Sequence, residues 1–397
     1  MGFIFKMKIG ILTFHSQLNY GGVLQAYAMQ MALQEMGHDA VVIDRWLDEH
    51  NGHLFGPFLN NWKGWIGTLI RGFAGTGKFG RLFRHWHTIR FIRQKLNLTP
   101  YHFDEWKDAP KELGVDIILV GSDQVWNGNY GRPRPYLLEG APSMPAVAYA
   151  ASFGMRALPE ELIAVYREGF KRFKAISVRE AEGIGLVESQ GATATHVVDP
   201  TLLLEPSIWK MKVKGSPKQK RTLVCYLLAE DVEALYPQLY AFAKAQHCKV
   251  KVLVDWYTLP FPKTVSQVIQ RIKHIVRNIF SPVKLDFAAG PQAFLNAFAN
   301  ATWLLSDSFH AVMFSSIFGK NVRILRPKNE FRKKMFARIE EFAKSSVASG
   351  NLIAEDVPSA LASFANDDPL QFNQDVIAQR RTESKAWLEN ALAEAVK

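Results

Sequence analysis

Several kinds of residue and pattern are scarce in this 397-residue sequence, and each absence excludes a class of protein. Its two cysteines, Cys225 and Cys248, are too few for a disulfide framework or a cysteine metal cluster, which favours a reducing compartment. There is no run of 18 apolar residues that could form a membrane-spanning helix. The first residues lack the charged-then-apolar layout of a signal peptide. We therefore expect a cytoplasmic protein.

Acidic residues are missing from two long stretches, and the whole chain has a formal net charge of +11. Eight lysines and arginines, and no acid, lie between Glu49 and Asp104. Five more lie between Asp255 and Asp286, again without an acid. In both stretches the basic residues alternate with aromatic and aliphatic ones, which is typical of contact with an acidic membrane surface or an anionic ligand. We predict peripheral contact with the inner face of the membrane. For residues 51–100 an insertion that packs on its own domain is the alternative.

Strand and helix patterns alternate along most of the chain, which predicts the α/β class. Lys8 to Phe14 is a predicted strand, Val23 to Met36 a helix, and Ala40 to Ile43 the next strand, so a right-handed parallel unit is expected. The same pattern restarts at Thr222 to Leu228. Chain length and a hydrophobic content of 48% suffice for two cores. We predict two Rossmann-like domains with a central inter-domain cleft.

The predicted N-terminal domain covers residues 7–205 and includes the basic, aromatic insertion 51–100. Residues 206–221 are a predicted linker, because prolines, a glycine and basic residues follow one another there without a steady period. The predicted C-terminal domain covers 222–369. Residues 370–397 are predicted to form a helix that packs back on the N-terminal domain.

Four polar loops fall at predicted carboxyl ends of strands, where parallel sheets bind ligands. They are residues 15–22, 121–127, Arg179 with 199–201, and 306–310. A loop aspartate is usually a helix cap and a strand-end arginine usually a surface ion pair, so one such loop is weak evidence. Together they predict a cleft in which arginine and histidine side chains face a small anion.

The stretch around residue 306 is the most informative of these loops. An apolar strand ends at Leu305, Asp307 or Ser308 is a predicted N-cap, and Phe309 to Phe318 is a predicted helix that ends at Gly319. The N–H groups at a helix N-terminus bind anions, and His310 in the first turn can reach the same anion. A capped helix with a packed histidine is the alternative interpretation.

Several motifs carry a resemblance to a known family. They are Asn19-Tyr-Gly-Gly22 with Gln25-Ala-Tyr-Ala28, Gly121-Ser-Asp-Gln-Val-Trp126, Ala151-Ser-Phe-Gly154, Ser177-Val-Arg-Glu180, Val198-Asp-Pro-Thr201 and Ser306-Asp-Ser-Phe-His310. In these motifs, and in their order from about residue 8 to 325, the chain resembles the polysaccharide pyruvyl transferases. The Ser-Asp-Ser-Phe-His block is the most specific. The motifs do not cover residues 51–100 or those beyond 345.

The resemblance implies a GT-B-like fold and a reaction that moves the enolpyruvyl unit of phosphoenolpyruvate onto a sugar diol of a polysaccharide or its lipid-linked repeat-unit precursor, releasing phosphate. It implies that Arg179 and His310 hold the donor's phosphate or carboxylate, with Ser308 and Phe309 beside them. Some relatives have an arginine before the histidine where this chain has Phe309, so one donor contact is either missing or supplied elsewhere. The other loop residues are expected to line the cleft or bind the acceptor: His15, Asn19, Tyr20, Gly21, Gln25, Ser122, Gln124, Trp126 and Ser152.

The residue types fit this chemistry. Phosphoenolpyruvate carries two anionic groups, which a guanidinium and helix-end donors can bind. Ketal formation needs an acid for the methylene carbon, for which we predict His310, and a base for the hydroxyl, for which we predict Asp123 or Asp307. No metal or cofactor is expected, and the absence of any Asp-x-Asp argues against a metal-dependent GT-A glycosyltransferase. Replacing Arg179 or His310 with alanine is expected to abolish turnover with little loss of fold.

Two other functions stay open on this evidence. A GT-B-fold glycosyltransferase with a nucleotide-sugar donor would have the same fold. A non-catalytic basic membrane-binding module would account for the charge but not for the strand-end loops. Nucleic acid is not an expected partner, because the basic residues form separate segments rather than a face built by the whole chain.

Overall fold

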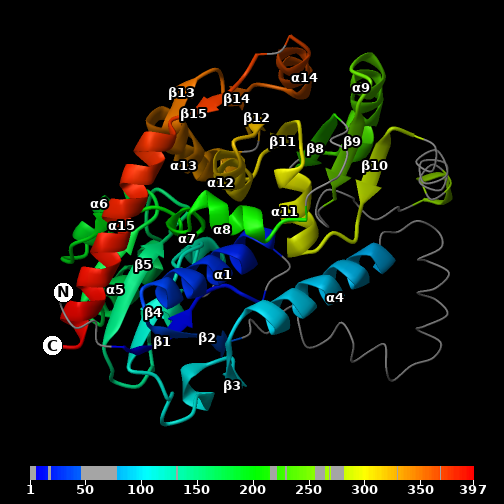
Figure 1. Ribbon diagram of the computed structural model, residues 1–397. Helices are drawn as coiled ribbons and strands as arrows, with labels where there is room; N and C mark the ends of the chain where they lie inside the picture. Colours follow the sequence, from blue (N-terminus) through cyan, green and yellow to red (C-terminus); the bar gives the residue numbers. More distant parts are fainter. Residues whose placement is uncertain are drawn as a thin grey trace, which may run out of the picture. The chain divides into compact units, whose positions relative to one another are not determined.

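The computed structural model describes residues 6–16, 19–45, 78–130, 133–214, 221–228, 230–254, 264–267, 269, 281–328, 330–366 and 368–397. The chain divides into two compact units. The first comprises residues 1–51, 91–205 and 375–397, and the second comprises 52–90 and 206–374. Each unit is built on its own parallel sheet with helices (Figure 1).

The first sheet has, within the described residues, seven parallel strands in the order β3-β2-β1-β4-β5-β6-β7. Its strands are β1 Lys8–Leu12, β2 Asp39–Arg45, β3 Leu98–Phe103, β4 Ile117–Val120, β5 Ala146–Ala151, β6 Ala175–Val178 and β7 Thr195–His196. The central strands β4 and β5 are buried at every position, because a parallel sheet is covered by helices on both faces.

Helices of the first unit pack on both faces of this sheet. They are α1 Tyr20–Glu35, α5 Ile163–Phe170, α6 Glu182–Glu188, α7 Pro200–Leu203 and α15 Gln374–Ala395, with 3-10 turns at Trp106–Asp108, Gly128–Tyr130, Arg134–Leu137 and Glu160–Leu162. Helix α4, Lys78–Lys95, runs from the second unit into the first.

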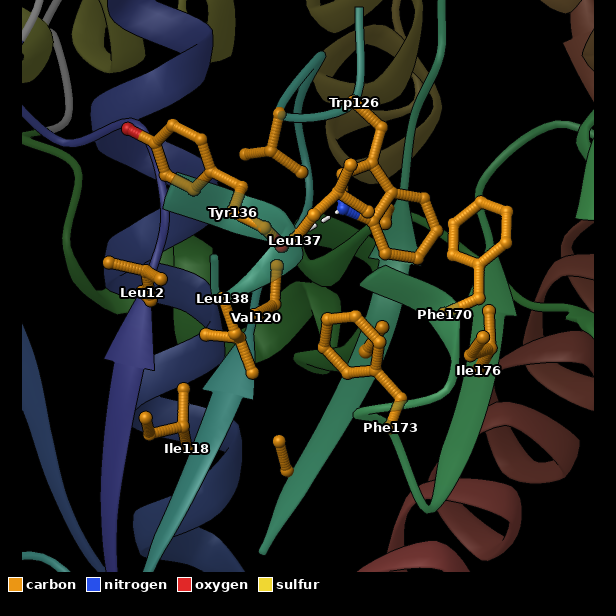
Figure 2. Close-up of a cluster of buried hydrophobic side chains, with 14 of the residues drawn as sticks. Leu12, Ile118, Val120, Trp126, Tyr136, Leu137, Leu138, Phe170, Phe173 and Ile176 are labelled. Atoms are coloured by element: carbon orange, nitrogen blue, oxygen red, sulfur yellow. Dashed lines mark hydrogen bonds between the residues drawn. The ribbon is translucent and has the colours of Figure 1, made fainter. Parts of the chain in front are cut away.

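An aromatic core covers one face of the first sheet (Figure 2). Trp126 is fully buried, and its ring packs against Phe153, Phe170 and Phe173 at centroid distances of 5.1–5.7 Å. Its indole Nε1 donates to the carbonyl of Tyr136 at 3.0 Å. The core therefore holds the strand-end loop 121–127 rigidly against the sheet.

The second sheet has, among the described residues, six parallel strands in the order β10-β9-β8-β11-β12-β14. Its strands are β8 Thr222–Tyr226, β9 Lys249–Leu253, β10 Val283–Asp286, β11 Trp303–Ser306, β12 Asn321–Leu325 and β14 Ile353–Ala354. The helices of this unit are α8 Pro206–Met211, α9 Val232–Ala245, α11 Pro291–Ala299, α12 Phe309–Phe318, α13 Glu330–Ser346 and α14 Val357–Ala365. A small antiparallel pair joins β13 Val347–Ser349 to β15 Gln371–Phe372.

Helix α12 is the most deeply buried helix segment beside the second sheet, with all ten of its residues buried. Phe314 packs edge-on against Trp209 of α8 at 5.0 Å and against Phe294 of α11 at 5.7 Å. Gly319 ends the helix in the left-handed conformation, at φ 61°, as the sequence predicts.

The predicted α/β class with two parallel sheets is confirmed. Both the predicted domains and the observed units divide after Glu205. Residues 52–90 group with the second unit, whereas the sequence pattern assigns 51–100 to the N-terminal domain. The predicted linker begins with a helix, α8, whose Trp209 is fully buried, so residues 206–211 belong to the second unit's core. Residues 51–77 of the predicted insertion, and most of the basic stretch 255–285, lie outside the described residues.

Candidate active site

The strand order of the first sheet reverses between β1 and β4, since β2 lies on one side of β1 and β4 on the other. Open parallel sheets bind ligands at the carboxyl edge beside such a reversal. The loop after β1 leads into α1, and the loop after β4 carries Ser122 and Asp123. We call the polar residues at this carboxyl edge, Gln25, Ser122, Asp123, Ser152, Arg179, Glu180 and Asp199, the first edge.

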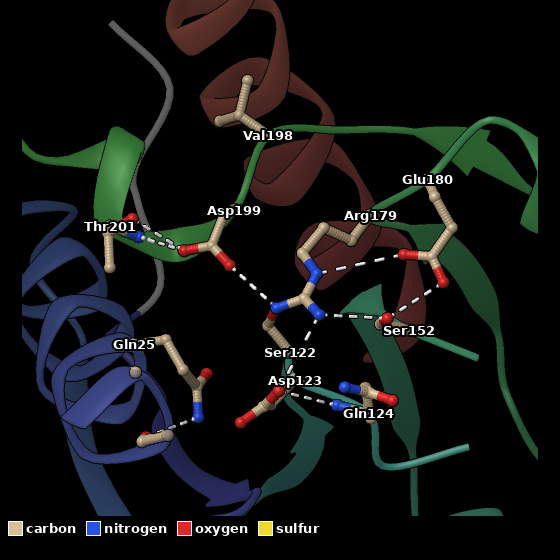
Figure 3. Close-up of polar contacts among 12 residues, drawn as sticks. Gln25, Ser122, Asp123, Gln124, Ser152, Arg179, Glu180, Val198, Asp199 and Thr201 are labelled. Atoms are coloured by element: carbon tan, nitrogen blue, oxygen red, sulfur yellow. Dashed lines mark hydrogen bonds and ion pairs between the residues drawn. The ribbon is translucent and has the colours of Figure 1, made fainter. Parts of the chain in front are cut away.

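Arg179, just beyond the end of β6, is the centre of the first edge (Figure 3). Its Nη1 donates to Asp199 Oδ2 at 3.1 Å and its Nη2 donates to Ser152 Oγ at 3.0 Å. Asp123 Oδ1 lies 3.7 Å from Nη2, and Glu180 Oε2 lies 3.9 Å from Nε. The guanidinium is thus surrounded by three carboxylates, and all four charged side chains are buried.

Two of these carboxylates are also held by other donors. Glu180 Oε1 accepts hydrogen bonds from Ser152 Oγ at 2.9 Å, Phe153 N at 2.7 Å and Gly154 N at 3.0 Å. Asp199 Oδ1 accepts from the backbone N–H and the hydroxyl of Thr201, at 2.9 and 2.7 Å. These bonds fix the position of both carboxylates beside the guanidinium.

Burial by itself lowers the pKa of Arg179, but the Asp199, Asp123 and Glu180 carboxylates outweigh it and raise that pKa above its ordinary value. The guanidinium therefore stays charged. One cation among three carboxylates leaves the cluster two charges negative. Such a cluster attracts hydrogen-bond donors and cations more than it attracts anions.

The loop after β1 places the other predicted residues of this edge. His15 is buried, with Nε2 3.1 Å from Asp44 Oδ1 and Nδ1 3.2 Å from the carbonyl of Thr13. Asn19 caps α1 by accepting from Gly21 N at 2.9 Å. Tyr20 and Gly21 form the buried first turn of α1. Residues 17 and 18 of this loop lie outside the described residues.

Four further predicted residues lie in the loops after β4 and β5. Ser122 Oγ donates to Asp199 Oδ2 at 3.5 Å, and Ser152 lies against Arg179. Gln124 Oε1 accepts from Asn127 Nδ2 at 2.6 Å, and Trp126 is buried in the aromatic core rather than on a ligand-facing surface. The structure therefore brings Ser122 and Ser152 to the arginine cluster and gives Trp126 a packing role.

The second sheet reverses its strand order between β8 and β11. We call the residues that follow β11, Asp307 to His310, the second edge. Asp307 Oδ1 accepts from Leu228 N at 2.7 Å, so it ties the loop after β8 to the loop after β11. Ser308 is the N-cap residue, but its side chain makes no capping hydrogen bond. Its backbone N–H donates to Ser306 Oγ at 3.2 Å.

His310 lies in the first turn of α12 and is buried. Its ring packs edge-on against Phe309 at 5.5 Å. The guanidinium of Arg338, from α13, lies over the same Phe309 ring, 4.9 Å from its centre. A cation and an imidazole therefore both contact Phe309, at the N-terminal end of a helix, where the dipole favours anions.

Sequence reasoning missed several residues of both edges. Asp199 and Glu180 stand in motifs that the sequence analysis singles out, yet only the sheet order shows that they surround Arg179. Asp44 at the end of β2 was not a candidate, although it directly follows a predicted strand. No sequence signal points to Arg338, since its partner Phe309 belongs to another helix.

No set of three or more His, Cys, Asp or Glu side chains in the described part is arranged to hold a metal ion. No helix in that part combines the length and apolar character needed to cross a membrane.

Solved structures share the arrangement of this chain at low sequence identity. UDP-GlcNAc 2-epimerase from Neisseria meningitidis, bound to UDP-GlcNAc, is 11% identical, with 97% of this chain and 99% of that one covered at a TM-score of 0.51. A putative UDP-N-acetylglucosamine 2-epimerase from Listeria monocytogenes is 11% identical, with coverage of 96% and 90% and a TM-score of 0.50. With the two parallel sheets, this likeness shows the GT-B-like fold that the resemblance implies, and it shows the fold alone.

At the level of sequence, no curated protein matches the chain significantly. A family model does match, and it covers residues 19–329, which is most of the chain and includes both edges. The model is that of polysaccharide pyruvyl transferase. The chain therefore belongs to the polysaccharide pyruvyl transferase family.

Proposed function

We propose that the protein transfers the enolpyruvyl unit of phosphoenolpyruvate to a sugar diol, on a polysaccharide or its lipid-linked precursor, and releases phosphate. The observation that carries this proposal is His310, buried in the first turn of α12 at the point where the second sheet reverses its strand order. An acid is needed beside a bound phosphate ester, and a helix N-terminus is a suitable place for that phosphate. Family membership supports the same reaction class.

The second edge would bind the donor. Its helix N-terminus and the cation of Arg338 suit the anionic groups of phosphoenolpyruvate, and Ser308 and Phe309 lie between them. We infer that Arg338 supplies the guanidinium contact that Phe309 cannot make itself. The prediction that Arg179 also contacts the donor stays a prediction.

The reaction balances with two hydroxyl groups and no added reagent. The first hydroxyl oxygen bonds to C2 of the donor while C3 takes up a proton, for which His310 is the proposed acid. The C2–O bond to phosphate then breaks, phosphate leaves with the electron pair, and the second hydroxyl oxygen takes its place at C2. One hydroxyl proton ends on C3 and the other on phosphate.

Incubation with phosphoenolpyruvate and a lipid-linked or nucleotide-linked galactoside tests this proposal by the release of phosphate. Mass spectrometry of the acceptor should show the added pyruvate ketal. The same protein with UDP-sugars in place of phosphoenolpyruvate tests the glycosyltransferase alternative. Transfer of a sugar, with no phosphate released from phosphoenolpyruvate, would overturn the proposed donor.

We also propose that α4 brings the enzyme to an acidic membrane surface, where a lipid-linked acceptor would lie. Phe83 and Trp86 are 56% and 49% exposed, and Arg90 lies over the Trp86 ring at 5.3 Å. With exposed Arg93 they follow a spacing of three and four residues, so they share one face of the helix. Large exposed aromatic rings beside arginines suit a lipid headgroup layer.

Flotation with liposomes that contain acidic lipid tests this contact. Replacing Arg90 and Arg93 with glutamine should weaken binding about 30-fold, at about 1 kcal/mol for each charge. Arg84 is unsuitable for the test, because it is buried and donates to the carbonyl of Val254 at 3.3 Å. Equal flotation of the variant and the wild type would reject the contact.

A further inference from the structure

The amide of Gln25 has a fixed orientation in the first unit. Its Nε2 group donates toward Thr13 Oγ1 at 2.8 Å, Phe14 O at 3.2 Å and Gly22 O at 2.9 Å. Thr13 Oγ1 gives its own hydrogen to Ser122 O at 2.8 Å, so it can only accept from Gln25. Turning the amide over would place its oxygen against three acceptors. The Oε1 atom therefore points away from them.

This Oε1 atom is a buried acceptor. Gln25 has 0% exposure, and Oε1 accepts no hydrogen bond from any residue that the structure describes. Buried carbonyl oxygens nearly always have a donor, because giving up water without a replacement costs free energy. A donor group on a bound molecule would satisfy it.

Asp123 borders the same place. Figure 3 shows the side chains of Gln25 and Asp123 facing one another. Asp123 Oδ1 accepts from Gln124 N at 2.9 Å, and its Oδ2 lies so close to Gly22 that a Cβ there would be 3.2 Å away. Gly22 is also the residue whose carbonyl holds the Gln25 amide. Asp123 Oδ2 therefore lies beside the turn of α1 that holds the Gln25 amide, at the reversal point between β1 and β4.

The charge around these oxygens selects the ligand group. Arg179 is already bonded to Asp199 and Ser152, and its cluster is two charges negative. A phosphate or carboxylate would meet acceptors and like charge there, whereas a neutral hydroxyl can donate to them.

We propose that Gln25 Oε1 and Asp123 Oδ2 bind a hydroxyl group of the sugar acceptor, that Asp123 takes its proton, and that Arg179 is a positioning residue for Asp123. This inference rests on the proposed function. The proton of the hydroxyl passes to Asp123 while the hydroxyl oxygen forms the bond to C2 of phosphoenolpyruvate. The electron pair of the C2=C3 bond takes up a proton at C3, and the C2–O bond to phosphate breaks in the following step.

Of the two aspartates predicted as the base, the geometry favours Asp123. Asp307 Oδ1 is used to join two loops through Leu228 N. Asp123 stands instead beside a second acceptor oxygen and a fixed cation. Its backbone is left-handed, at φ 69°, a conformation that Asp and Asn adopt more readily than other side chains. Asp123→Asn therefore removes the charge and keeps the backbone.

The first test compares Asp123→Asn with wild type by phosphate release and by phosphoenolpyruvate titration calorimetry. We expect kcat to fall about 100-fold to 10,000-fold, with the Kd for phosphoenolpyruvate changed less than threefold. For Arg179→Lys we expect a smaller fall in kcat with the Kd for phosphoenolpyruvate unchanged, because an ammonium cannot keep the separate bonds that the guanidinium makes. A kcat for Asp123→Asn within tenfold of wild type, or a Kd more than tenfold weaker in Arg179→Lys, would overturn the inference.

Two glycine-to-alanine variants test the position of Asp123 without removing any polar group. Gly22→Ala adds a methyl group 3.2 Å from Asp123 Oδ2 and 3.3 Å from the carbonyl oxygen of Phe14, so the carboxylate or the loop after β1 must shift by a few tenths of an ångström. Gly185→Ala adds the same methyl group to α6 with nothing within 4 Å. We expect kcat to fall several-fold to tenfold in Gly22→Ala and to be unchanged in Gly185→Ala. Equal activity of the two variants would contradict the position of Asp123 in the site.

Saturation-transfer NMR with a panel of neutral methyl glycosides needs no turnover, so it separates this inference from the proposed function. Binding by wild type that is lost in Asp123→Asn, with circular dichroism unchanged, supports the hydroxyl site even if phosphoenolpyruvate is not the donor. No binding of any glycoside, or equal binding by the variant, would overturn the site even if phosphate is released.

Discussion

The two edges occupy equivalent places in two similar sheets, yet their chemistry is opposite. The first edge presents acceptor oxygens, from Gln25 and Asp123, around a cation that is already bonded. The second edge presents a helix N-terminus, the imidazole of His310 and the nearby cation of Arg338. One position in the fold can therefore serve a hydroxyl donor in one unit and an anion in the other. This difference is the basis for proposing the first edge for the acceptor and the second edge for the donor.

The opposite polarity comes from how each aspartate is used. In the first edge Asp199 and Glu180 fix Arg179 by two separate sets of bonds, and Asp123 keeps one oxygen directed toward Gly22. In the second edge the carboxylate of Asp307 is bonded to backbone and closes the junction between β8 and β11. Carboxylates surround a cation in one unit and join two loops in the other.

The largest expected effect is that of His310→Gln, which tests the donor side of the comparison between the two edges. Glutamine keeps hydrogen-bonding capacity but cannot deliver a proton as imidazolium, so kcat should fall about 100-fold to 10,000-fold. Phosphate release at saturating substrates measures this. Because the second edge is assigned to the donor, binding of neutral methyl glycosides should be unchanged. Loss of glycoside binding in this variant would show that the two edges are not chemically separate.

Arg179→Met tests the acceptor side through stability. It leaves three carboxylates buried without their cation, so we expect a loss of about 3–5 kcal/mol of unfolding free energy in the first unit. Burial thus revises the expectation that this arginine can be removed with little loss of fold. Hydrogen exchange of strands β4 to β6, set against β8 to β12, measures the first unit separately. Equal protection in variant and wild type would mean that the cluster is not held by its charge pairs.

Arg338→Gln sharpens the comparison on the donor side. Losing one charge-assisted contact should weaken phosphoenolpyruvate binding about tenfold or more. Arg326→Gln is the matched control, since that arginine also lies over an aromatic ring, Phe336, at 5.5 Å. Its ion pairs with Glu340 and Glu355 are largely exposed and contribute little. The same loss of affinity in both variants would remove Arg338 from the site.

The smallest expected effect is a difference in pH response. In the first unit, burial lowers the pKa of His38 below 6.5, although the charge of Glu389 opposes this shift. The unfolded chain therefore binds a proton at His38 more readily than the folded chain does, and stability falls as the pH drops below about 6.5. In the second unit, burial raises the pKa of Cys225 and Cys248, so stability falls as the pH rises above about 9. Hydrogen exchange should show acid loosening in the first unit, and loosening of the second unit between about pH 9 and 10. Above about pH 10 the first unit should loosen too, because burial raises the pKa of Tyr136, Tyr149 and Tyr166. Removing the acid response with His38→Gln would confirm its source; an unchanged response would exclude it.

Local signals were sufficient for much of the fold and for the location of the edges. The helix Phe309–Phe318 and the strand Ala175–Val178 were predicted at their observed bounds, because a cap, a stop glycine and an apolar run determine them within a few residues. The polar loops could be placed at strand ends for the same reason.

The partners within each edge could not be predicted in this way. Arg179 and Asp123 are 56 positions apart and meet only because β4, β5 and β6 are neighbours in the sheet. Trp126 follows a polar motif, yet its ring turns into the aromatic core, because a large apolar surface gains more from burial than from facing a ligand site. Such pairings depend on tertiary contacts between residues far apart in the sequence, which a local pattern of apolar residues does not reveal.

Helix α15 has a consequence for how the molecule is made. It crosses back to the first unit, where Ser384 Oγ accepts from Val198 N at 3.1 Å and Arg381 donates to Leu202 O at 2.7 Å, on either side of Asp199. The loop that anchors Arg179 is thus tied to residues translated nearly 180 positions later. During synthesis the second unit can close before the first is finished, so until α15 has been made the loop that carries Asp199 lacks these two contacts.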